Sequence, residues 1–166
     1  MGYTHYWRQL RDFTDTEWQE LTRLTKLITV GARATALLDP DEFNIDNEEI
    51  RFNGVRDDAH ETFLITKKKR LKADYEEQEA YDRQGAFEFC KTAQKPYDRY
   101  VVAVLCAIYR VQRDVMNISS DGNTADWTEG LFHAVRSTRE EEMYCPIRDC
   151  LTLSYVDYLD QKKKTG

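Results

Sequence analysis

The chain of 166 residues lacks the features that mark membrane and secreted proteins. No apolar run approaches the roughly 20 residues that a membrane-spanning helix needs. The N-terminus has no basic segment followed by an apolar one, so we expect no signal peptide. The four cysteines contain no C-x-x-C pair, and Cys106 lies in an apolar stretch where a small core residue is expected. Together these absences predict a protein of a reducing cytoplasm.

The motifs of the common enzyme classes are missing as well. There is no G-x-S-x-G elbow, no G-x-x-x-x-G-K-[ST] phosphate loop and no G-x-G-x-x-G fingerprint. His60-Glu61 begins like a zinc-binding H-E-x-x-H helix but has no second histidine, so we expect neither a metal nor a cofactor. His60-x-Thr62 matches half of the two-histidine phosphoesterase signature, which needs a second such unit to divide the acid and base roles. A phosphodiesterase or hydrolase that uses His60 therefore stays an alternative.

The charge balance argues against duplex nucleic acid as a partner. The net charge is −6 and the pI is near 5.2, whereas a duplex binder usually has a basic surface. The basic run 67–70 is followed at once by acidic residues and is typical of a solvated face. We predict a single domain over 1–166, with a charged insertion at 67–85 and a basic tail at 161–166.

Hydrophobic periodicity predicts an α+β domain. Thr14 and Glu17 have the spacing of a capping box, and a helix should follow up to Val30, where Gly31 ends or kinks it. We expect a mostly antiparallel sheet of about five short strands with two or three helices packed on one face. The expected strands cover 2–10, 50–54, 60–66, 86–90 and 116–120; the expected helices cover 14–30, 99–113 and 126–139, with mixed helical features over 147–159 and a further helix considered over 74–83.

The segment 89–98 and the helix after it stand out as the centre of the fold. The helix is apolar over much of its circumference, which is typical of a buried element. The turn before it concentrates lysines, a threonine and a tyrosine where backbone N–H groups and the helix dipole favour an anion. Purely structural roles are an alternative for the same residues, because Tyr97 and Pro96 are suited to beginning a helix and Asp98 to compensating its dipole.

A polar and aromatic pocket is predicted around this turn. Cations, hydroxyls, an amide and aromatic rings form the mixture that holds a phosphate and stacks a base. Trp7 and Trp127 are expected in the core instead, and His133 as a packed residue. The candidate ligand-binding residues are His5, Tyr6, Arg51, Asn53, His60, Thr62, Lys91, Thr92, Lys95, Tyr97, Ser120 and Asp121, with Ser119 beside them.

Several blocks of the chain resemble a family of small uncharacterised proteins common in bacteriophage and prophage genomes. They are GYTHYW at 2–7, IRFNG at 50–54, HETF at 60–63, FCKTA-x-KPYD at 89–98 and SSDG at 119–122. The resemblance covers about residues 2–128, and Trp127 falls within it. The 67–85 insertion and the chain after Arg139 depart from it. The resemblance implies a phage accessory protein of the host cytoplasm, a class that often counters host defence.

Three functions remain open at this point. The first is a homo-oligomeric binder that sequesters a small anionic, nucleotide-like ligand such as a host immune signal; Lys91→Ala and Tyr97→Ala are then expected to abolish binding and preserve the fold. The second is an inhibitor whose acidic surface blocks a host defence protein. The third is the His60 hydrolase. The polar and aromatic cluster, together with the absence of a complete catalytic set, favours the first.

Overall fold

A computed structural model describes residues 2–70, 84–140, 142–147, 152–153 and 155–165 of the chain. The greater part of the predicted charged insertion, including the helix considered over 74–83, lies outside these ranges. The remainder is an arrangement of helices and short antiparallel strands, so the predicted α+β class is confirmed.

Within the described ranges, the strands form two separate three-stranded sheets and a two-stranded ribbon. The first sheet has the order β5-β1-β6, and both neighbours run antiparallel to the central strand. The second has the order β2-β3-β4, in which β3 and β4 form the predicted hairpin. The five predicted strands all exist, but they do not belong to one sheet. The bounds are β1 Thr4–Gln9, β2 Asn44–Ile45, β3 Glu49–Phe52, β4 Phe63–Thr66, β5 Ala86–Lys91, β6 Met116–Ser120, β7 Met143–Tyr144 and β8 Thr152–Leu153.

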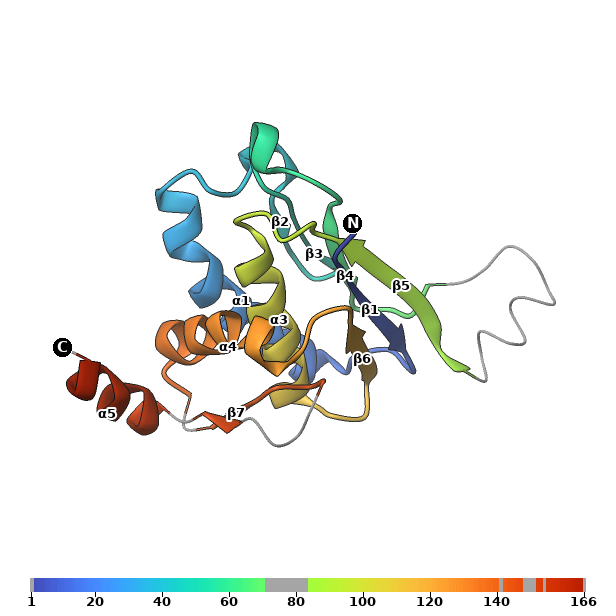
Figure 1. Ribbon diagram of the computed structural model, residues 1–166. Helices are drawn as coiled ribbons and strands as arrows, with labels where there is room; N and C mark the ends of the chain where they lie inside the picture. The colour runs from blue at the N-terminus through green and yellow to red at the C-terminus, as the bar shows by residue number, and fades with distance from the viewer. Residues whose placement is uncertain (1, 71–83, 141, 148–151, 154, 166) are drawn as a thin grey trace.

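The helices α1, α3 and α4 lie on the same side of β1 and β5 (Figure 1). Helix α1 continues three residues past Gly31, which neither ends nor interrupts it. Residues 161–165 of the predicted tail are the last part of a helix, α5. None of the helices in the described ranges is long and apolar enough to cross a bilayer. The bounds are α1 Asp15–Ala34, α3 Asp98–Val111, α4 Thr124–Thr138 and α5 Tyr155–Thr165, with two 3-10 turns, η1 Pro40–Glu42 and η2 Arg56–Asp58.

The predicted capping box begins α1. The Thr14 hydroxyl accepts a hydrogen bond from the Glu17 N–H at 3.2 Å, and the Glu17 carboxylate accepts one from the Thr14 N–H at 3.2 Å. Arg11 adds a two-pronged ion pair to the same carboxylate at 2.9 Å and lowers the pKa of Glu17. Because these residues are close in sequence, their pattern was sufficient to place the start of the helix.

Helix α3 is the centre of the core, as its composition predicts. Its residues 100–108 are all buried, Cys106 among them. Trp7 and Trp127 are buried too, which confirms their expected place. The Trp7 ring lies 5.6 Å from that of Phe63 in β4, so this contact joins the inner faces of the two sheets.

Candidate functional site

His5 is a buried polar residue at the centre of the first sheet. Alternation along β1 turns His5 to the inner face together with Trp7, and the register places it opposite Ser120 of β6. Its Nε2 lies 2.6 Å from Asp98 Oδ1, at the first residue of α3, and its Nδ1 lies 2.9 Å from Ser120 Oγ. A carboxylate can only accept, so Nε2 donates to Asp98.

Asp98 is the residue that this buried network holds in place. Its Oδ1 accepts from His5 and also from the Thr92 hydroxyl at 2.5 Å, and both donors are fully buried. No described residue forms a hydrogen bond with its second oxygen, Oδ2, and the Asp98 side chain is 15% exposed. The carboxylate is therefore fixed in orientation with one acceptor atom left for another group.

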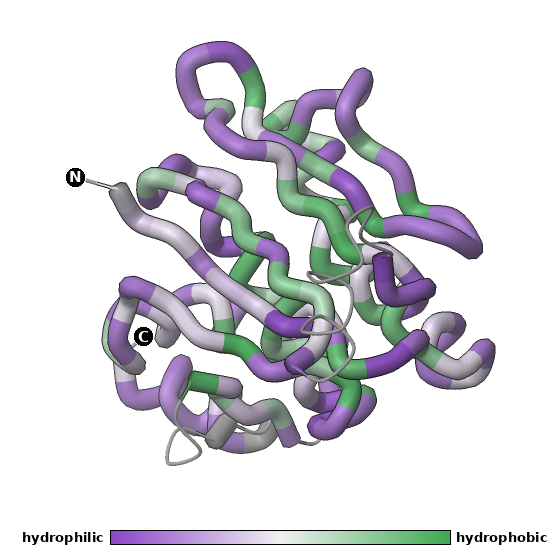
Figure 2. The backbone as a smooth tube through the Cα atoms, turned by 90° about the vertical axis from the view of Figure 1, so that its right-hand side faces the viewer, coloured by the Kyte–Doolittle hydropathy of each residue, from purple (hydrophilic) through white to green (hydrophobic). Residues whose placement is uncertain are grey.

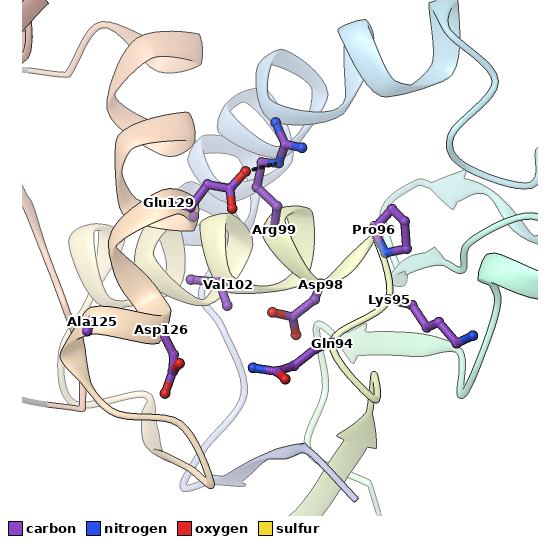
Figure 3. Close-up of a pocket in the computed structure, with 10 residues that line it drawn as sticks. Gln94, Lys95, Pro96, Asp98, Arg99, Val102, Ala125, Asp126 and Glu129 are labelled. Atoms are coloured by element: carbon purple, nitrogen blue, oxygen red, sulfur yellow. Dashed lines mark ion pairs between the residues drawn. The ribbon is translucent and has the colours of Figure 1, made fainter. Parts of the chain in front are cut away.

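A pocket of about 350 Å³ lies beside Asp98, between the 94–96 turn and the first turns of α3 and α4. Figure 3 shows the side chains of Gln94 and Asp98 directed into the space between α3 and α4, whereas that of Asp126 extends toward the loop before α4, where its Oδ2 accepts from the Asn123 N–H at 2.8 Å. Its volume is within the range of small-molecule sites. Val102 and Gly130 form its apolar part, where a Cβ on Gly130 would come within 2.3 Å of Val102 Cγ1.

The cations of this pocket are already engaged. Lys95 Nζ donates to the Asp57 carbonyl at 2.8 Å, and Figure 3 shows its side chain directed away from the pocket. The Arg99 guanidinium lies 3.2 Å from Glu129 Oε1. Asp126 Oδ2 and Glu129 Oε1 are occupied as well, so the acceptors that remain toward a ligand include Asp98 Oδ2, Asp126 Oδ1 and the Gln94 amide oxygen. This is a setting for hydrogen-bond donors more than for a bare anion.

The start of α3 consequently differs from the predicted anion site. The backbone N–H groups of Lys95, Asp98 and Tyr100 donate to the carbonyls of Thr92, Lys95 and Tyr97, so few remain for a ligand. The Asp98 carboxylate also compensates the positive end of the helix dipole. Both effects reduce the attraction for a phosphate at this point.

Two further features surround His5. Its ring meets those of Tyr3 and Trp127 edge-on, at 5.1 and 5.3 Å. Burial, and after it the charge of Asp98, raises the pKa of Tyr3 to about 12, so its hydroxyl stays neutral. Trp127 Nε1 is buried and has no hydrogen-bond partner in the described part of the chain. Such an orphaned polar atom costs free energy and is more typical of functional sites than of ordinary cores.

A second group of predicted residues connects the two sheets instead of lining a pocket. The Tyr97 hydroxyl donates to the Glu61 carbonyl at 2.6 Å, and the Lys91 N–H donates to Glu61 Oε2 at 2.7 Å. The Asn53 side chain closes the loop between β3 and β4 by bonding to both the N–H and the carbonyl of His60. We call the two Glu61 contacts, from Tyr97 and Lys91, the interlock. Because Tyr97 and Asn53 are buried, their role is structural.

The remaining predicted residues lie in other places. The His60 side chain is exposed, and no described residue forms a hydrogen bond with its ring. The Thr62 hydroxyl donates to Glu42 at 2.6 Å, and Arg51 is exposed on β3, 3.8 Å from Glu49. Tyr6, Ser119 and Asp121 lie on the outer side of the first sheet, where the Tyr6 hydroxyl donates to Asp121 at 3.2 Å. Described residues form no cluster arranged to hold a metal ion.

The structure thus places four of the twelve predicted residues either at the rim of the pocket or in the hydrogen-bond network that holds Asp98. His5, Thr92 and Ser120 hold or align Asp98, and the stem of Lys95 lies at the rim. Sequence reasoning did not include Asp98, Gln94 or Asp126 among the ligand-binding residues. Asp126 had a local signal, since it forms a capping box with Asn123 at the start of α4. The pairing of Asp98 with His5 had none.

Fold and site together define an α+β protein with a carboxylate-lined pocket between two helices. No protein-family model, curated protein or solved structure matches the chain.

Proposed function

We propose that this protein binds a small nucleotide-like ligand in the pocket between α3 and α4 and holds it without turnover. The observation that carries the proposal is Asp98: a carboxylate fixed by His5 and Thr92, with its second oxygen left to accept from a ligand beside a pocket of about 350 Å³. Preorganised acceptors bind without the entropic cost of ordering a flexible side chain.

The free groups of the pocket select the part of the ligand that enters it. Asp98 and Asp126 accept from ribose hydroxyls or from an exocyclic amine, and the Gln94 amide can both donate and accept at a base edge. Glu129 is paired with Arg99, but the Asp98 and Asp126 carboxylates repel a multiply charged phosphate, so the phosphate lies outside the pocket. A nucleoside monophosphate or a cyclic nucleotide meets these conditions better than a triphosphate.

The biological setting of the proposal comes from the resemblance to phage proteins. A phage accessory protein that retains a nucleotide signal of the host would act as a sponge in the host cytoplasm. A homo-oligomer would raise the number of sites in one particle.

The test is binding of a pool of mono-, di- and cyclic nucleotides to the purified protein. Native mass spectrometry identifies the retained ligand and the subunit count, and titration calorimetry then gives its affinity. Asp98→Asn keeps an acceptor for His5 and Thr92 but removes the charge, and it should weaken binding by about tenfold or more, since hydrogen bonds to charged groups contribute about 1.5–3 kcal/mol.

Asp41→Asn is the matched control, because Asp41 is an exposed carboxylate in η1 and does not line the pocket. It should bind as the parent protein does. Equal affinity of Asp98→Asn and the parent, or no retained nucleotide, would refute the proposal.

A second candidate is a hydrolase in which Asp98 acts as the general base. The 2.6 Å hydrogen bond from His5 to Asp98 favours it, because a base oriented by a buried partner is the arrangement that catalysis needs. Chromatography of the same mixtures after incubation separates the two functions. Unchanged nucleotide supports retention, whereas conversion that is lost in Asp98→Asn establishes the enzyme.

A further inference from the structure

The outer face of the first sheet exposes aromatic rings. Phe87 and Phe89 of β5 are 40% and 53% exposed, although the inner face of the same sheet is buried around Trp7 and Cys90. An antiparallel sheet with one solvated face normally presents polar side chains there. Two exposed phenylalanines on one strand therefore indicate a surface that binds something.

The register joins these two rings to a third. Tyr6 of β1 lies opposite Phe89, and its ring stacks beside that of Phe87 with centroids 6.2 Å apart and planes 19° from parallel. The Phe87 and Phe89 centroids are 6.0 Å apart. The three rings form one continuous surface, which we call the aromatic platform. The strands that carry it lie toward the viewer in Figure 2.

Cations flank the platform in a protein whose net charge is −6. Arg8 lies opposite Phe87, with its guanidinium carbon 5.0 Å from the centre of that ring. Lys91 has the same parity on β5, and β6 adds the neutral Asn117 and Ser119. Among the described residues, Asp121 supplies a carboxylate to this face, and it is occupied by the Thr4 N–H and the Tyr6 hydroxyl. The face is locally cationic and aromatic.

We propose that this face of the β5-β1-β6 sheet binds single-stranded nucleic acid, with bases stacked on Tyr6, Phe87 and Phe89 and the phosphates met by Arg8 and Lys91. Two aromatic residues at positions i and i+2 of one strand and a third on its antiparallel neighbour form the kind of platform on which sheet-based binders stack two or three bases. Stacking needs unpaired bases, so a duplex is not a ligand for it.

A second copy of the chain fits this face less well. A stable dimer buries about 800 Å² on each partner, which is several times the exposed area of three aromatic side chains. Two copies meeting face to face would also bring two surfaces with the same cations together. Charge and area therefore favour a polyanion with exposed bases.

The test is fluorescence anisotropy with labelled 12-nucleotide single strands, one of RNA and one of DNA, at low and moderate salt. The parent protein should bind at least one of them, with affinity falling as salt rises. Phe87→Ala and Phe89→Ala should each weaken binding by about tenfold, in keeping with the contribution of one stacked base. Arg8→Gln should reduce the salt dependence.

Val30→Ala is the control, since Val30 is an apolar side chain 62% exposed on α1, away from the sheet, and its loss should leave binding unchanged. Asp98→Asn should also bind the oligonucleotides normally, which separates this site from the α3–α4 pocket. No anisotropy change with either strand, equal binding of the parent and the phenylalanine variants, or preference for duplex overturns the proposal. A dimer in the parent that Phe89→Ala converts to monomer, without oligonucleotide binding, would assign the face to self-association.

Discussion

Removing the Tyr97 hydroxyl should destabilise the protein, because it removes the hydrogen bond that this hydroxyl donates to Glu61 in the interlock. Tyr97 is fully buried and donates to the Glu61 carbonyl at 2.6 Å. Burial and the neighbouring groups raise the pKa of Tyr97 above its usual range, so the hydroxyl remains a donor at any physiological pH. In Tyr97→Phe, the Glu61 carbonyl keeps only the weak Cys90 Sγ donor at 3.4 Å.

The expected loss is about 1–2 kcal/mol, since a buried acceptor left without its main donor costs more than the net value of one hydrogen bond. With a slope of roughly 2 kcal/mol per molar urea, the unfolding midpoint should fall by about 0.5–1 M. Tyr97→Ala removes the ring as well and should cost about 3–5 kcal/mol. Because Tyr97 is buried, loss of binding in Tyr97→Ala would not separate a lost ligand contact from a damaged fold, so this variant is a poor test of the pocket.

Urea unfolding followed by tryptophan fluorescence measures both variants. Tyr6→Phe is the control, because its hydroxyl bonds to Asp121 at the exposed surface and its loss should change the free energy of unfolding by less than about 0.5 kcal/mol. If Tyr97→Phe unfolds at the same urea concentration as the parent, the interlock is not a stabilising contact and the reasoning fails.

Further predictions concern two helix glycines, Gly130 of α4 and Gly31 of α1, and the buried His133 of α4. Gly130→Ala should destabilise the protein by about 1–3 kcal/mol through overpacking, because the new Cβ would lie 2.3 Å from Val102 Cγ1. Gly31→Ala meets no atom within 4 Å and should stabilise α1 by about 0.5–1 kcal/mol, so thermal unfolding of the two variants should shift in opposite directions, and a shared direction would contradict the packing argument. Burial lowers the pKa of His133, whose Nε2 donates to the Ile28 carbonyl at 2.8 Å while Nδ1 accepts from Arg136. Below pH 6.5, the ordinary pKa of histidine, His133 is protonated in the unfolded chain but stays neutral in the folded one. The free energy of unfolding should therefore fall as the pH drops from 7 toward 5. His133→Gln should flatten that dependence in urea titrations, and an unchanged slope would exclude His133 as its source.

Much of the secondary structure could be predicted from the sequence because its causes are local. The Thr14–Glu17 capping box, the apolar circumference of α3 and the alternation in β3 and β4 each depend on residues a few positions apart. Burial of Trp7 and Trp127 followed from the same patterns. Of the two effects predicted for Gly31, an end or a kink, the end is wrong, because α1 continues to Ala34. A single glycine costs a helix only about 1 kcal/mol, and α1 is held by its packed face.

The candidate sites depend on partners that are distant along the chain. Asp98 meets His5 across 93 residues, and the pocket needs α4 to pack against α3. Alternation showed that Phe87 and Phe89 share a face, but not that this face is the exposed one. The sequence by itself determined the helices and strands and the apolar face of each, through short-range sterics and hydrophobic periodicity. Tertiary packing alone decided which stripe met which, because that choice minimises the exposed apolar area of the whole chain and no short segment contains it.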